Sequence, residues 1–275
     1  MYDDPAPDDG FDELTRKITR ETAFRCASYK DKCLRRRIAV RMRARNADTF
    51  SAYSDVLDAD AAEYEQLLDA LTVNVTKFFR NPSAFASVAR NVVPELWLRR
   101  TPLRVWSAGS ASGEEAFTIA TLFHEHAGEV GELEELARVT VIGSDIDRAS
   151  LHAARTAIYH PASFTDTDPD LLDRLFPSTR EGRTVLPEVR AITHFERRDI
   201  LQDPPEAGSF DFIACRNVVI YLDRASQEVL LDQLVDALRP GGYLMMGHVE
   251  TLFGNARKRL VAIDVRERIY RKPPA

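Results

Sequence analysis

The sequence is poor in cysteine and has no long apolar run. Its 275 residues include three cysteines, Cys26, Cys33 and Cys215, and none of them forms a Cys-x-x-Cys pair. This number and spacing argue against a disulfide framework and a cysteine zinc site, so we expect a reducing compartment and no metal. No apolar segment reaches the roughly 18 residues that a membrane-spanning helix requires. We therefore expect no insertion into a membrane.

The sequence also lacks an excess of positive charge. The 37 Lys and Arg residues oppose 43 Asp and Glu residues, which gives a formal net charge of −6. This balance disfavours a globally basic nucleic-acid-binding protein. Residues 1–10, MYDDPAPDDG, are acidic and interrupted by Pro and Gly, unlike a secretory signal. We expect this segment to be disordered and the protein to be cytoplasmic.

The segment 11–72 has the periodicity of helices. Apolar residues recur every three or four positions, as in Leu34, Ile38 and Met42. No alternating β-branched run interrupts them, so we expect a small all-α domain. The segment 73–100 is predicted to connect this domain to the rest of the chain and to carry one further helix, over 83–98.

From residue 101 short apolar strands alternate with helices. This order predicts a parallel sheet covered on both faces. The expected strands span 103–108, 139–144, 193–198, 210–215 and 243–247, and the expected helices 114–126, 148–157 and 224–238. Gly241-Gly242 is expected to cap the last of these helices.

Two parts of the region 101–275 depart from the alternation. The runs 260–265 and 268–270 have no helix between them, which predicts an antiparallel pair at the end of the sheet. Residues 159–192 contain several prolines and one β-like run near 184–189. We therefore interpret 159–192 as an insertion.

The loop after the first predicted strand carries glycines and acids. Ligands of an open parallel sheet bind beyond the carboxyl ends of its strands. Gly109 and Gly113 allow the backbone to approach a ligand closely, and Glu114 and Glu115 open the next helix. Carboxylates at this place suit a cationic group such as an α-amine better than a phosphate. The same two glutamates would equally complement the helix dipole.

Acids also follow the next two predicted strands. Asp145 has a carboxylate that can accept both hydroxyls of a ribose, while Asp147 is expected to be a helix N-cap. Asp199 follows the strand-like segment 193–198 and can accept from an exocyclic amine. An acceptor for an amine, one for a ribose and one for an adenine, in strand order, together point to S-adenosylmethionine.

Five segments occur in the order and approximate spacing of one known family. They are NVTKFFR at 74–80, WSAGSASGEE at 106–115, GSDID at 143–147, FDFIACRNVVIYL at 210–222 and GHVE at 247–250. Over about residues 70–270 the chain resembles the chemoreceptor glutamate methyltransferases of the CheR type. The resemblance implies a small all-α domain followed by an α/β, Rossmann-like class I methyltransferase domain with a small inserted β-subdomain. It also implies methyl transfer from S-adenosylmethionine to receptor glutamates, giving γ-methyl esters and S-adenosylhomocysteine.

The resemblance implies roles for individual residues. Arg80 and Tyr221 match the pair beside the transferring methyl, although Tyr221 would otherwise be read equally well as a packing residue. Together with the glycine turn, the expected cofactor-binding set is Asn74, Thr76, Arg80, Gly109, Gly113, Glu115, Asp145, Asp199, Ile200, Arg216 and Asn217. Asp199 replaces the family's asparagine, but no departure removes a cofactor carboxylate. We therefore expect an active enzyme.

A run of eight basic residues between positions 30 and 45 faces only one acid, Asp31. Such a run is usually a solvated helix face. The resemblance implies that this domain contacts the acidic methylation helices of receptors. We therefore expect substrate binding by Arg36, Arg37, Arg41 and Arg43. Nucleic acid is the competing partner, but no interleaved aromatics support it and we do not expect it.

Three functions are compatible with these sequence features. The leading one is a glutamate O-methyltransferase that acts on methyl-accepting chemotaxis receptors. The alternatives are a nucleic-acid methyltransferase of the same fold and a non-catalytic signalling scaffold that binds S-adenosylmethionine. Base-labile transfer of labelled methyl to receptor membranes separates the first from the other two. Docking of a receptor's C-terminal peptide on the insertion by strand addition stays open.

Overall fold

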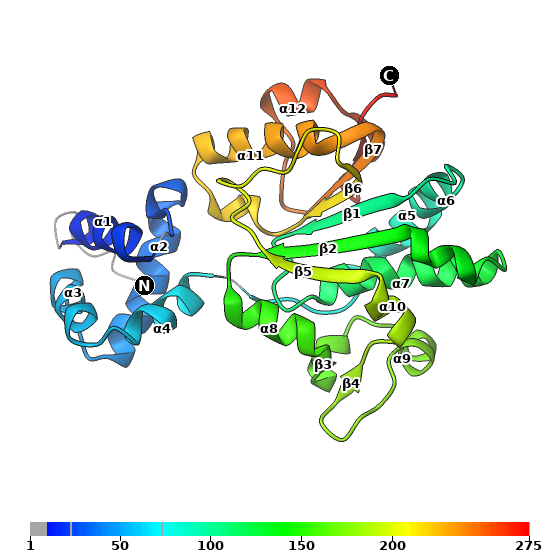
Figure 1. Ribbon diagram of the computed structural model, residues 1–275. Helices are drawn as coiled ribbons and strands as arrows, with labels where there is room; N and C mark the ends of the chain where they lie inside the picture. The colour runs from blue at the N-terminus through cyan, green and yellow to red at the C-terminus, as the bar shows by residue number, and fades with distance from the viewer. Residues whose placement is uncertain (1–9, 23, 73, 275) are drawn as a thin grey trace. The chain divides into compact units, whose positions relative to one another are not determined.

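The computed structural model describes residues 10–22, 24–72 and 74–274 (Figure 1). The chain forms two compact units. One contains the chain up to Val73 together with Tyr221–Ser226, and the other contains Asn74–Ile220 and Gln227–Ala275. The expected disorder of residues 1–10 falls, apart from Gly10, outside the described residues.

The first unit is all-helical, as the periodicity predicts. Its elements are α1 (Phe11–Thr22), a 3-10 turn η1 (Cys26–Ser28), α2 (Asp31–Ala44), α3 (Phe50–Ala59) and α4 (Glu63–Leu71). The apolar stripe of α2, Leu34, Ile38 and Met42, is buried in a core that all four helices share. The spacing of these residues therefore sets which face of α2 points inward.

A buried carboxylate joins three helices of this unit. Glu63 is 1% exposed and accepts hydrogen bonds from Arg41 Nε and Nη2, both at 2.8 Å, and from Tyr53 Oη at 2.7 Å. Arg45 adds a longer contact at 3.4 Å. Burial alone would raise the pKa of Glu63, but the hydrogen bonds from Arg41 and Tyr53 outweigh it and hold the pKa below its usual value. The charged form is therefore the one that stabilises the fold.

The second unit contains a seven-stranded sheet in the order β5-β2-β1-β6-β7-β9-β8. Its strands are β1 (Leu103–Ala108), β2 (Val139–Asp145), β5 (Thr193–Arg197), β6 (Phe210–Cys215), β7 (Leu238–Met246), β8 (Val261–Asp264) and β9 (Ile269–Arg271). The first five in spatial order are parallel, whereas β9 runs antiparallel to β7 and to β8. This arrangement confirms the predicted parallel sheet with an antiparallel pair at its end.

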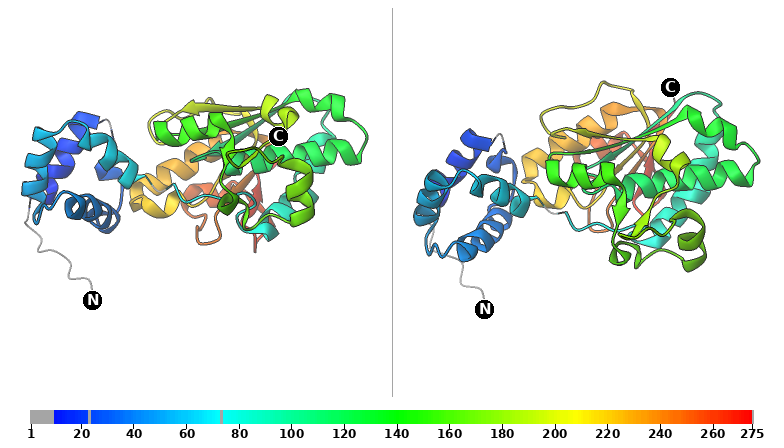
Figure 2. Two further views of the ribbon diagram at one scale, coloured as in Figure 1. Left: turned by 90° about the horizontal axis from the view of Figure 1, so that it is seen from below. Right: turned by 60° about the horizontal axis from the view of Figure 1, so that its bottom comes forward.

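Helices cover both faces of this sheet (Figures 1 and 2). In Figure 1, α11 (Arg224–Ala237) and α12 (Gly254–Lys258) lie on one side, and α7 (Glu114–Glu129) and α8 (Arg148–Thr156) lie on the other. The remaining connections include α5 (Pro82–Asn91), α6 (Val93–Trp97), η2 (Leu133–Arg138) and η4 (Val219–Tyr221). The fold is thus α/β, with the ends of the parallel strands facing one common edge.

Two local predictions are wrong. Gly241-Gly242 does not cap a helix, because α11 ends at Ala237 and the glycines lie inside β7. A Cβ on Gly242 would lie 2.9 Å from Arg239 O and 3.1 Å from Asp211 O, so close strand packing requires glycine there. The single helix expected over 83–98 is instead the pair α5 and α6, with Pro94 in the first turn of α6.

The segment 159–192 is an insertion with a two-stranded antiparallel sheet. It contains β3 (Ile158–Tyr159), η3 (Pro161–Phe164), α9 (Pro169–Leu175), β4 (Arg183–Thr184) and α10 (Pro187–Ala191). The β-like run expected near 184–189 is wrong beyond Thr184, because Pro187 opens α10. Phe78 stacks on Phe164 at 4.5 Å between ring centroids, and its N–H donates to Ser163 O at 2.8 Å. The segment 74–80 is thereby fixed to the insertion.

We expect Glu63→Gln to lower the free energy of unfolding by about 1–3 kcal/mol near neutral pH, because the amide cannot accept from all the donors around it. Since the folded pKa is depressed, this contribution is complete above the unfolded Glu value of about 4.3 and disappears as the pH falls through the folded value. Urea unfolding of the full chain near neutral and acidic pH measures it. Glu65→Gln, on the exposed side of α4, is the control and should change little. A difference that persists unchanged at acid pH would contradict the assignment.

Candidate functional site

Four loops meet at the carboxyl edge of the parallel strands. They follow β1, β2, β6 and β7, which are neighbours in the sheet in the order β2-β1-β6-β7. The turn after β1 begins with Gly109 and Ser110, whose N–H groups both donate to Ser144 O at 2.9 Å. The start of the turn after β1 is thus hydrogen-bonded to the carboxyl end of β2.

The glycine turn after β1 has the conformation expected from its sequence. Gly109 and Gly113 have φ values of +77° and +94°, where side chains are strained. A Cβ on Gly113 would lie 2.8 Å from Phe195 Cζ and 2.9 Å from Ala154 Cβ. The turn therefore requires glycine both for its backbone angle and for the close approach of its neighbours.

The two glutamates that open α7 lie in different surroundings. Glu114 is 3% exposed, accepts from Ser112 Oγ at 2.7 Å, and has a pKa raised by burial. Glu115 is only partly buried and accepts from Ser107 Oγ at 2.8 Å. The sequence leaves open that both glutamates complement the dipole of α7. That role does not explain why one of them is buried and the other is partly exposed. Glu115 keeps part of its side chain exposed, and its expected contact with the cofactor stays a prediction.

Asp145, at the end of β2, is 8% exposed and bound to backbone. Its Oδ2 accepts from Ala111 N at 2.9 Å and its Oδ1 from Asp147 N at 3.0 Å. A carboxylate has about four acceptor positions, so these two bonds do not use its full acceptor capacity. Asp147 caps α8 through Ala149 N, as expected, and also accepts from Asn74 Nδ2 at 2.5 Å. The contact brings the segment 74–80 to the end of β2.

Asp199 lies beyond β5 and shapes its own turn. Its Oδ1 accepts from Leu201 N at 2.9 Å and Gln202 N at 3.3 Å, and both Asp199 and Ile200 are partly buried. The structure provides a local structural role for this carboxylate. Its expected adenine contact stays a prediction.

Arg216 contacts several segments at this edge. Its side chain is 2% exposed; Nη2 donates to Arg80 O and Asn81 Oδ1, both at 2.8 Å, and Nη1 approaches Glu115 Oε2 at 3.3 Å. Phe85 lies 5.0 Å below the guanidinium. One buried cation therefore links the loop after β6 to α7 and to the segment 74–80. Its partner Asn81 was not among the residues expected from the sequence.

The segment 74–80 itself is held in a compact loop. Arg80 Nη1 donates to Val75 O at 2.8 Å, and the side chains of Asn74, Thr76 and Arg80 are all partly exposed. Phe79 and Asn81 have φ values of +51° and +64°. Asn74 thus contacts Asp147, and Arg216 links the carbonyl of Arg80 to Glu115. The expected cofactor contacts of Asn74, Thr76 and Arg80 stay predictions.

The expected catalytic residue Tyr221 groups with the helical unit. Its carbonyl accepts from Lys30 N at 3.0 Å, and the Arg37 guanidinium lies 5.6 Å from its ring centroid. Burial lowers the pKa of Arg37. The position of Tyr221 beside the transferring methyl stays a prediction.

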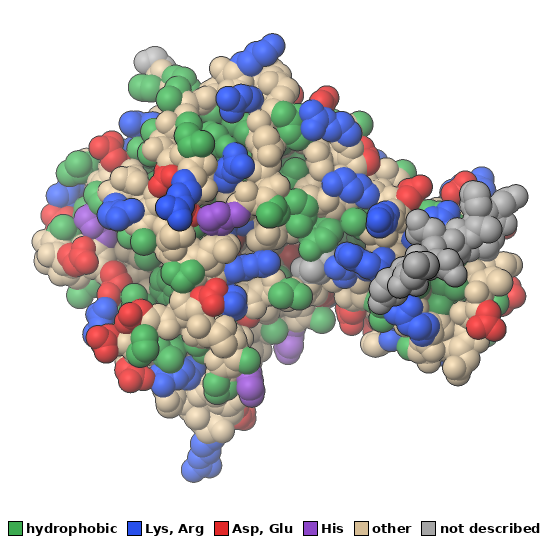
Figure 3. All heavy atoms as spheres, turned by 180° about the vertical axis from the view of Figure 1, so that it is seen from behind, with side chains coloured by type: hydrophobic (Ala, Val, Ile, Leu, Met, Phe, Trp, Pro, Cys, Tyr) green, Lys and Arg blue, Asp and Glu red, His purple; other side chains and the backbone are tan. Residues whose placement is uncertain are grey.

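The basic residues of α2 fall into two groups. Arg36 and Arg43 are exposed, whereas Arg41 is bound by Glu63 and Arg37 donates to Ala70 O at 3.0 Å. In the larger unit, Lys and Arg side chains on the face shown in Figure 3 are interspersed with acidic and apolar ones. The number of basic residues in the sequence of α2 is therefore larger than the number of basic side chains exposed on its surface.

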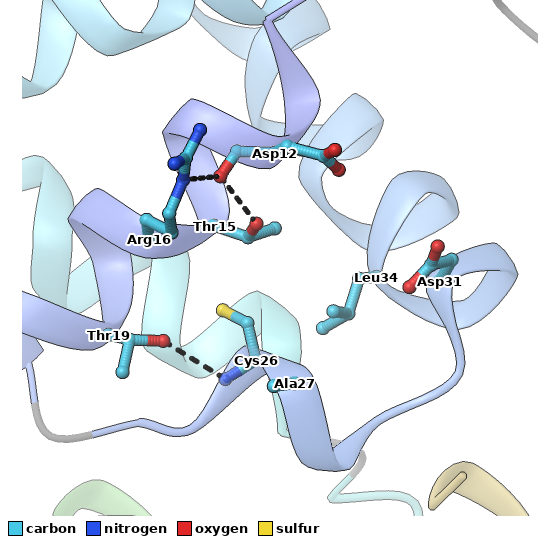
Figure 4. A pocket seen from close by; sticks show the side chains of 8 residues that line it. All are labelled: Asp12, Thr15, Arg16, Thr19, Cys26, Ala27, Asp31 and Leu34. Carbon is cyan, nitrogen blue, oxygen red and sulfur yellow. Dashed lines mark hydrogen bonds between the residues drawn. The ribbon is translucent and has the colours of Figure 1, made fainter. Parts of the chain in front are cut away.

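A pocket of about 360 Å³ lies in the helical unit, between α1, η1 and α2 (Figure 4). Its lining includes the buried Cys26, whose N–H donates to Thr19 Oγ1 at 3.2 Å. Burial raises the pKa of the Cys26 thiol to about 11, so it is neutral at physiological pH and a poor nucleophile. Among residues 10–22, 24–72 and 74–274, no group of three or more metal-binding side chains occurs. The loops at the edge of the sheet thus form the main candidate site.

The residues at this edge fit an adenosyl cofactor. Carboxylate acceptors lie at Glu115, in the first turn of α7, and at Asp145, the last residue of β2. Ser110 Oγ and Arg216 Nε are buried and have no hydrogen-bond partner within the described part of the chain. Buried polar atoms are normally satisfied, so these two atoms are consistent with a polar ligand at this edge.

The doubly wound sheet, the glycine turn after β1 and the acid at the end of β2 define a class I S-adenosylmethionine-dependent methyltransferase domain. Residues 74–268 match the family model described as "CheR methyltransferase, SAM binding domain", and residues 9–72 match "CheR methyltransferase, all-alpha domain". The chain belongs to the CheR methyltransferase family. No helix in the described residues is long and apolar enough to cross a membrane.

Similar proteins come from several bacteria. "Chemotaxis protein methyltransferase 2" of Pseudomonas aeruginosa is 32% identical over 246 residues, which cover 87% of this chain and 85% of that protein. The chemotaxis protein methyltransferase of Salmonella typhimurium is 32% identical over 255 residues, covering 90% and 85%. An uncharacterised 104.1 kDa protein of Rhodobacter capsulatus is 30% identical over 274 residues, but this chain spans only 28% of its length.

We expect Asp145→Ala to weaken binding of S-adenosylhomocysteine by about 1–3 kcal/mol, because ribose hydroxyls would lose a buried acceptor. The variant also frees Ala111 N and Asp147 N, so its unfolding is measured in parallel. Asp168→Ala is the control: Asp168 accepts from two backbone N–H groups at the start of α9. Its removal should cost stability and leave the affinity unchanged. Unchanged affinity in Asp145→Ala would remove Asp145 from the site.

Proposed function

We propose that this protein transfers the methyl group of S-adenosylmethionine to glutamate side chains of chemotaxis receptors, giving γ-methyl esters and S-adenosylhomocysteine. The observation that carries this proposal is the Arg216 network, which joins the backbone of Arg80 to the carboxylate of Glu115. Arg216 thereby connects Arg80, a cation suited to a substrate carboxylate, with Glu115, an anion suited to the amine of the cofactor. The relatives from Pseudomonas and Salmonella, named as chemotaxis methyltransferases, support the substrate class.

The chemistry requires little from the protein beyond alignment. Bound S-adenosylmethionine supplies an electrophilic methyl group on a sulfonium. A glutamate side chain has a reference pKa of about 4.3 and is already ionised at neutral pH, so a general base is not required. Holding the two reactants in line can contribute roughly 7–11 kcal/mol. The task of this chain is therefore to bind and orient.

Arg80 is the side chain that we assign to orienting the substrate. Its guanidinium offers two parallel N–H donors to a carboxylate. The bond from Nη1 to Val75 O fixes one end of the guanidinium and limits its rotation. The carbonyl of Arg80 also accepts a hydrogen bond from Arg216. Hydrogen bonds therefore restrain both the backbone and the side chain of Arg80.

Glu115 and Asp145 are assigned to the cofactor. Glu115 Oε1 accepts from Ser107 and Oε2 meets Arg216, which fixes the plane of the carboxylate beside the glycine turn. Asp145 is oriented by Ala111 N and Asp147 N. Both carboxylates are thus positioned by the chain itself before a ligand binds, which lowers the entropic cost of binding.

Receptor recognition is assigned to the exposed arginines of α2, Arg36 and Arg43. Both side chains are exposed, whereas Arg41 donates hydrogen bonds to the buried Glu63. An acidic receptor helix is the complementary surface. The reaction is placed in the cytoplasm, since receptor methylation helices are cytoplasmic.

We expect Arg80→Ala to lower the rate of methyl transfer roughly a hundredfold through lost alignment, with affinity for S-adenosylhomocysteine nearly retained. Transfer of labelled methyl to receptor membranes, with base-labile label, measures the rate, and calorimetry measures the affinity. Arg80→Lys, which keeps the charge but not the fork, should be intermediate. Arg257→Ala, an exposed arginine of α12, is the control and should behave as the wild type. A loss confined to cofactor binding would make Arg80 a cofactor contact alone.

We expect the double variant Arg36→Glu/Arg43→Glu to raise the KM for receptor, most at low salt, because exposed charge pairs are screened as ionic strength rises. Folding stability and cofactor affinity should stay nearly the same. The measurement is receptor methylation across a salt series.

The control for this variant is Arg257→Glu/Lys258→Glu on α12, which changes the net charge by the same amount at exposed positions of the other unit. Equal rates for wild type and Arg36→Glu/Arg43→Glu at every salt concentration would show that these arginines are only a solvated face. Loss of binding to duplex RNA or DNA, with receptor methylation intact, would favour a nucleic-acid substrate instead.

A further inference from the structure

Glu250 is a buried carboxylate that the proposed chemistry does not use. It lies in the turn after β7, is 2% exposed, and donates its own N–H to Gly247 O at 3.0 Å. Burial raises the pKa of this carboxyl group. A buried charge destabilises a fold unless hydrogen bonds compensate for its lost hydration. The partners of Glu250 therefore indicate what it contributes.

Within the described residues, backbone N–H groups surround the Glu250 carboxylate. Oε2 accepts from Gly247 N at 2.7 Å and Asn217 N at 3.0 Å. Oε1 accepts from Val218 N at 3.0 Å and, at a longer 3.4 Å, from Ile220 N. Three of the four donors belong to the loop after β6. Both oxygens of an ionised carboxylate are acceptors, so both can bind these N–H groups. A glutamine would place its NH₂ group against one pair of N–H groups, and those two groups would lose their acceptor.

The loop after β6 needs an acceptor of this kind. Asn217 has a φ of +60°, a left-handed conformation that few residues besides glycine, asparagine and aspartate adopt. The loop follows the last residue of β6, and the N–H groups of Asn217 and Val218 donate to Glu250. A Cβ on Gly247 would lie 2.7 Å from Glu250 Oε2 and 3.0 Å from Asn217 N. The glycine lets the turns after β6 and β7 approach closely enough to share one carboxylate.

The same loop contacts the candidate cofactor site on two sides. Val218 packs against the glycine turn, since a Cβ on Gly109 would lie 2.5 Å from Val218 Cγ2. Arg216, one residue before the bend, reaches Glu115. The position of the bend at Asn217 therefore affects both the turn at Gly109 and the Glu115 carboxylate.

We propose that Glu250 is a positioning residue of the cofactor site: its carboxylate holds residues 217–220 in place, and through Val218 and Arg216 it sets the positions of the glycine turn and of Glu115. The assignment of this edge to S-adenosylmethionine is the one part of the proposed function on which this inference rests. The identity of the methyl acceptor does not enter it.

The test is the binding of S-adenosylhomocysteine to Glu250→Gln, which keeps the size of the side chain and removes the charge. We expect affinity to fall at least about tenfold, because backbone donors of the loop lose their acceptor. Glu63→Gln is the matched control, since Glu63 is an equally buried and fully hydrogen-bonded glutamate in the helical unit. It should lose stability while its affinity stays within about twofold of the wild type.

Hydrogen exchange separates positioning from a general structural role. In Glu250→Gln the amides of residues 217–220 should exchange faster, while those of β1 and β2 stay protected. If that variant does not fold, Glu250→Asp keeps the charge one methylene shorter and should show the same local pattern with a smaller loss of affinity. Affinity within about twofold of wild type in the folded variant, or faster exchange across the whole sheet without a local effect, would overturn the proposal. Failure of receptor methylation with these results intact would contradict only the proposed substrate.

Discussion

The burial of the Arg216 guanidinium is the constraint on which the candidate site depends. A cation removed from water must be surrounded by acceptors, because an unpaired buried charge costs several kcal/mol. Here the acceptors come from two stretches of chain distant from Arg216 in the sequence: the carbonyl of Arg80 and the amide oxygen of Asn81 in one, and the carboxylate of Glu115 in the other. Satisfying one side chain therefore brings together the loop after β6, the start of α7 and the segment before α5. These are the same stretches that carry the expected cofactor and substrate contacts.

Buried carboxylates have different tasks because their donors differ. Glu63 accepts from the side chains of Arg41 and Tyr53 and joins three helices of one unit. Glu250 accepts from backbone N–H groups of the loop after β6 and of Gly247. Glu115 has one serine, one arginine and remaining exposure, which leaves acceptor capacity for a ligand. The residue type is the same in all three cases, and the surroundings decide how much of its acceptor capacity the protein itself uses.

The basic helix α2 shows why charge counted along a sequence differs from charge available to a partner. Arg41 is bound by a buried glutamate, and Arg37 contacts a carbonyl and the ring of Tyr221. Only part of the run, including Arg36 and Arg43, points to solvent. An arginine used inside a domain is fixed and partly neutralised, so it contributes little to long-range attraction. The surface proposed to meet receptors is accordingly narrower than the run of eight residues.

The distribution of apolar residues in the sequence determined the elements of this protein, because buried positions recur about every 3.6 residues on a helix and form short continuous runs on a strand covered on both faces. It predicts the helical unit from Leu34, Ile38 and Met42, and the strands 103–108 and 210–215 at their observed bounds. The glycine turn and the acids at Glu115 and Asp145 were also predictable, since the ends of parallel strands share an edge. Tertiary structure alone decided the place of Gly241-Gly242 within β7, the partners of Arg216 and the loop-holding contacts of Glu250. These depend on contacts between segments about 30 to 140 residues apart, and a local pattern carries no information about which distant donors and acceptors will be buried together.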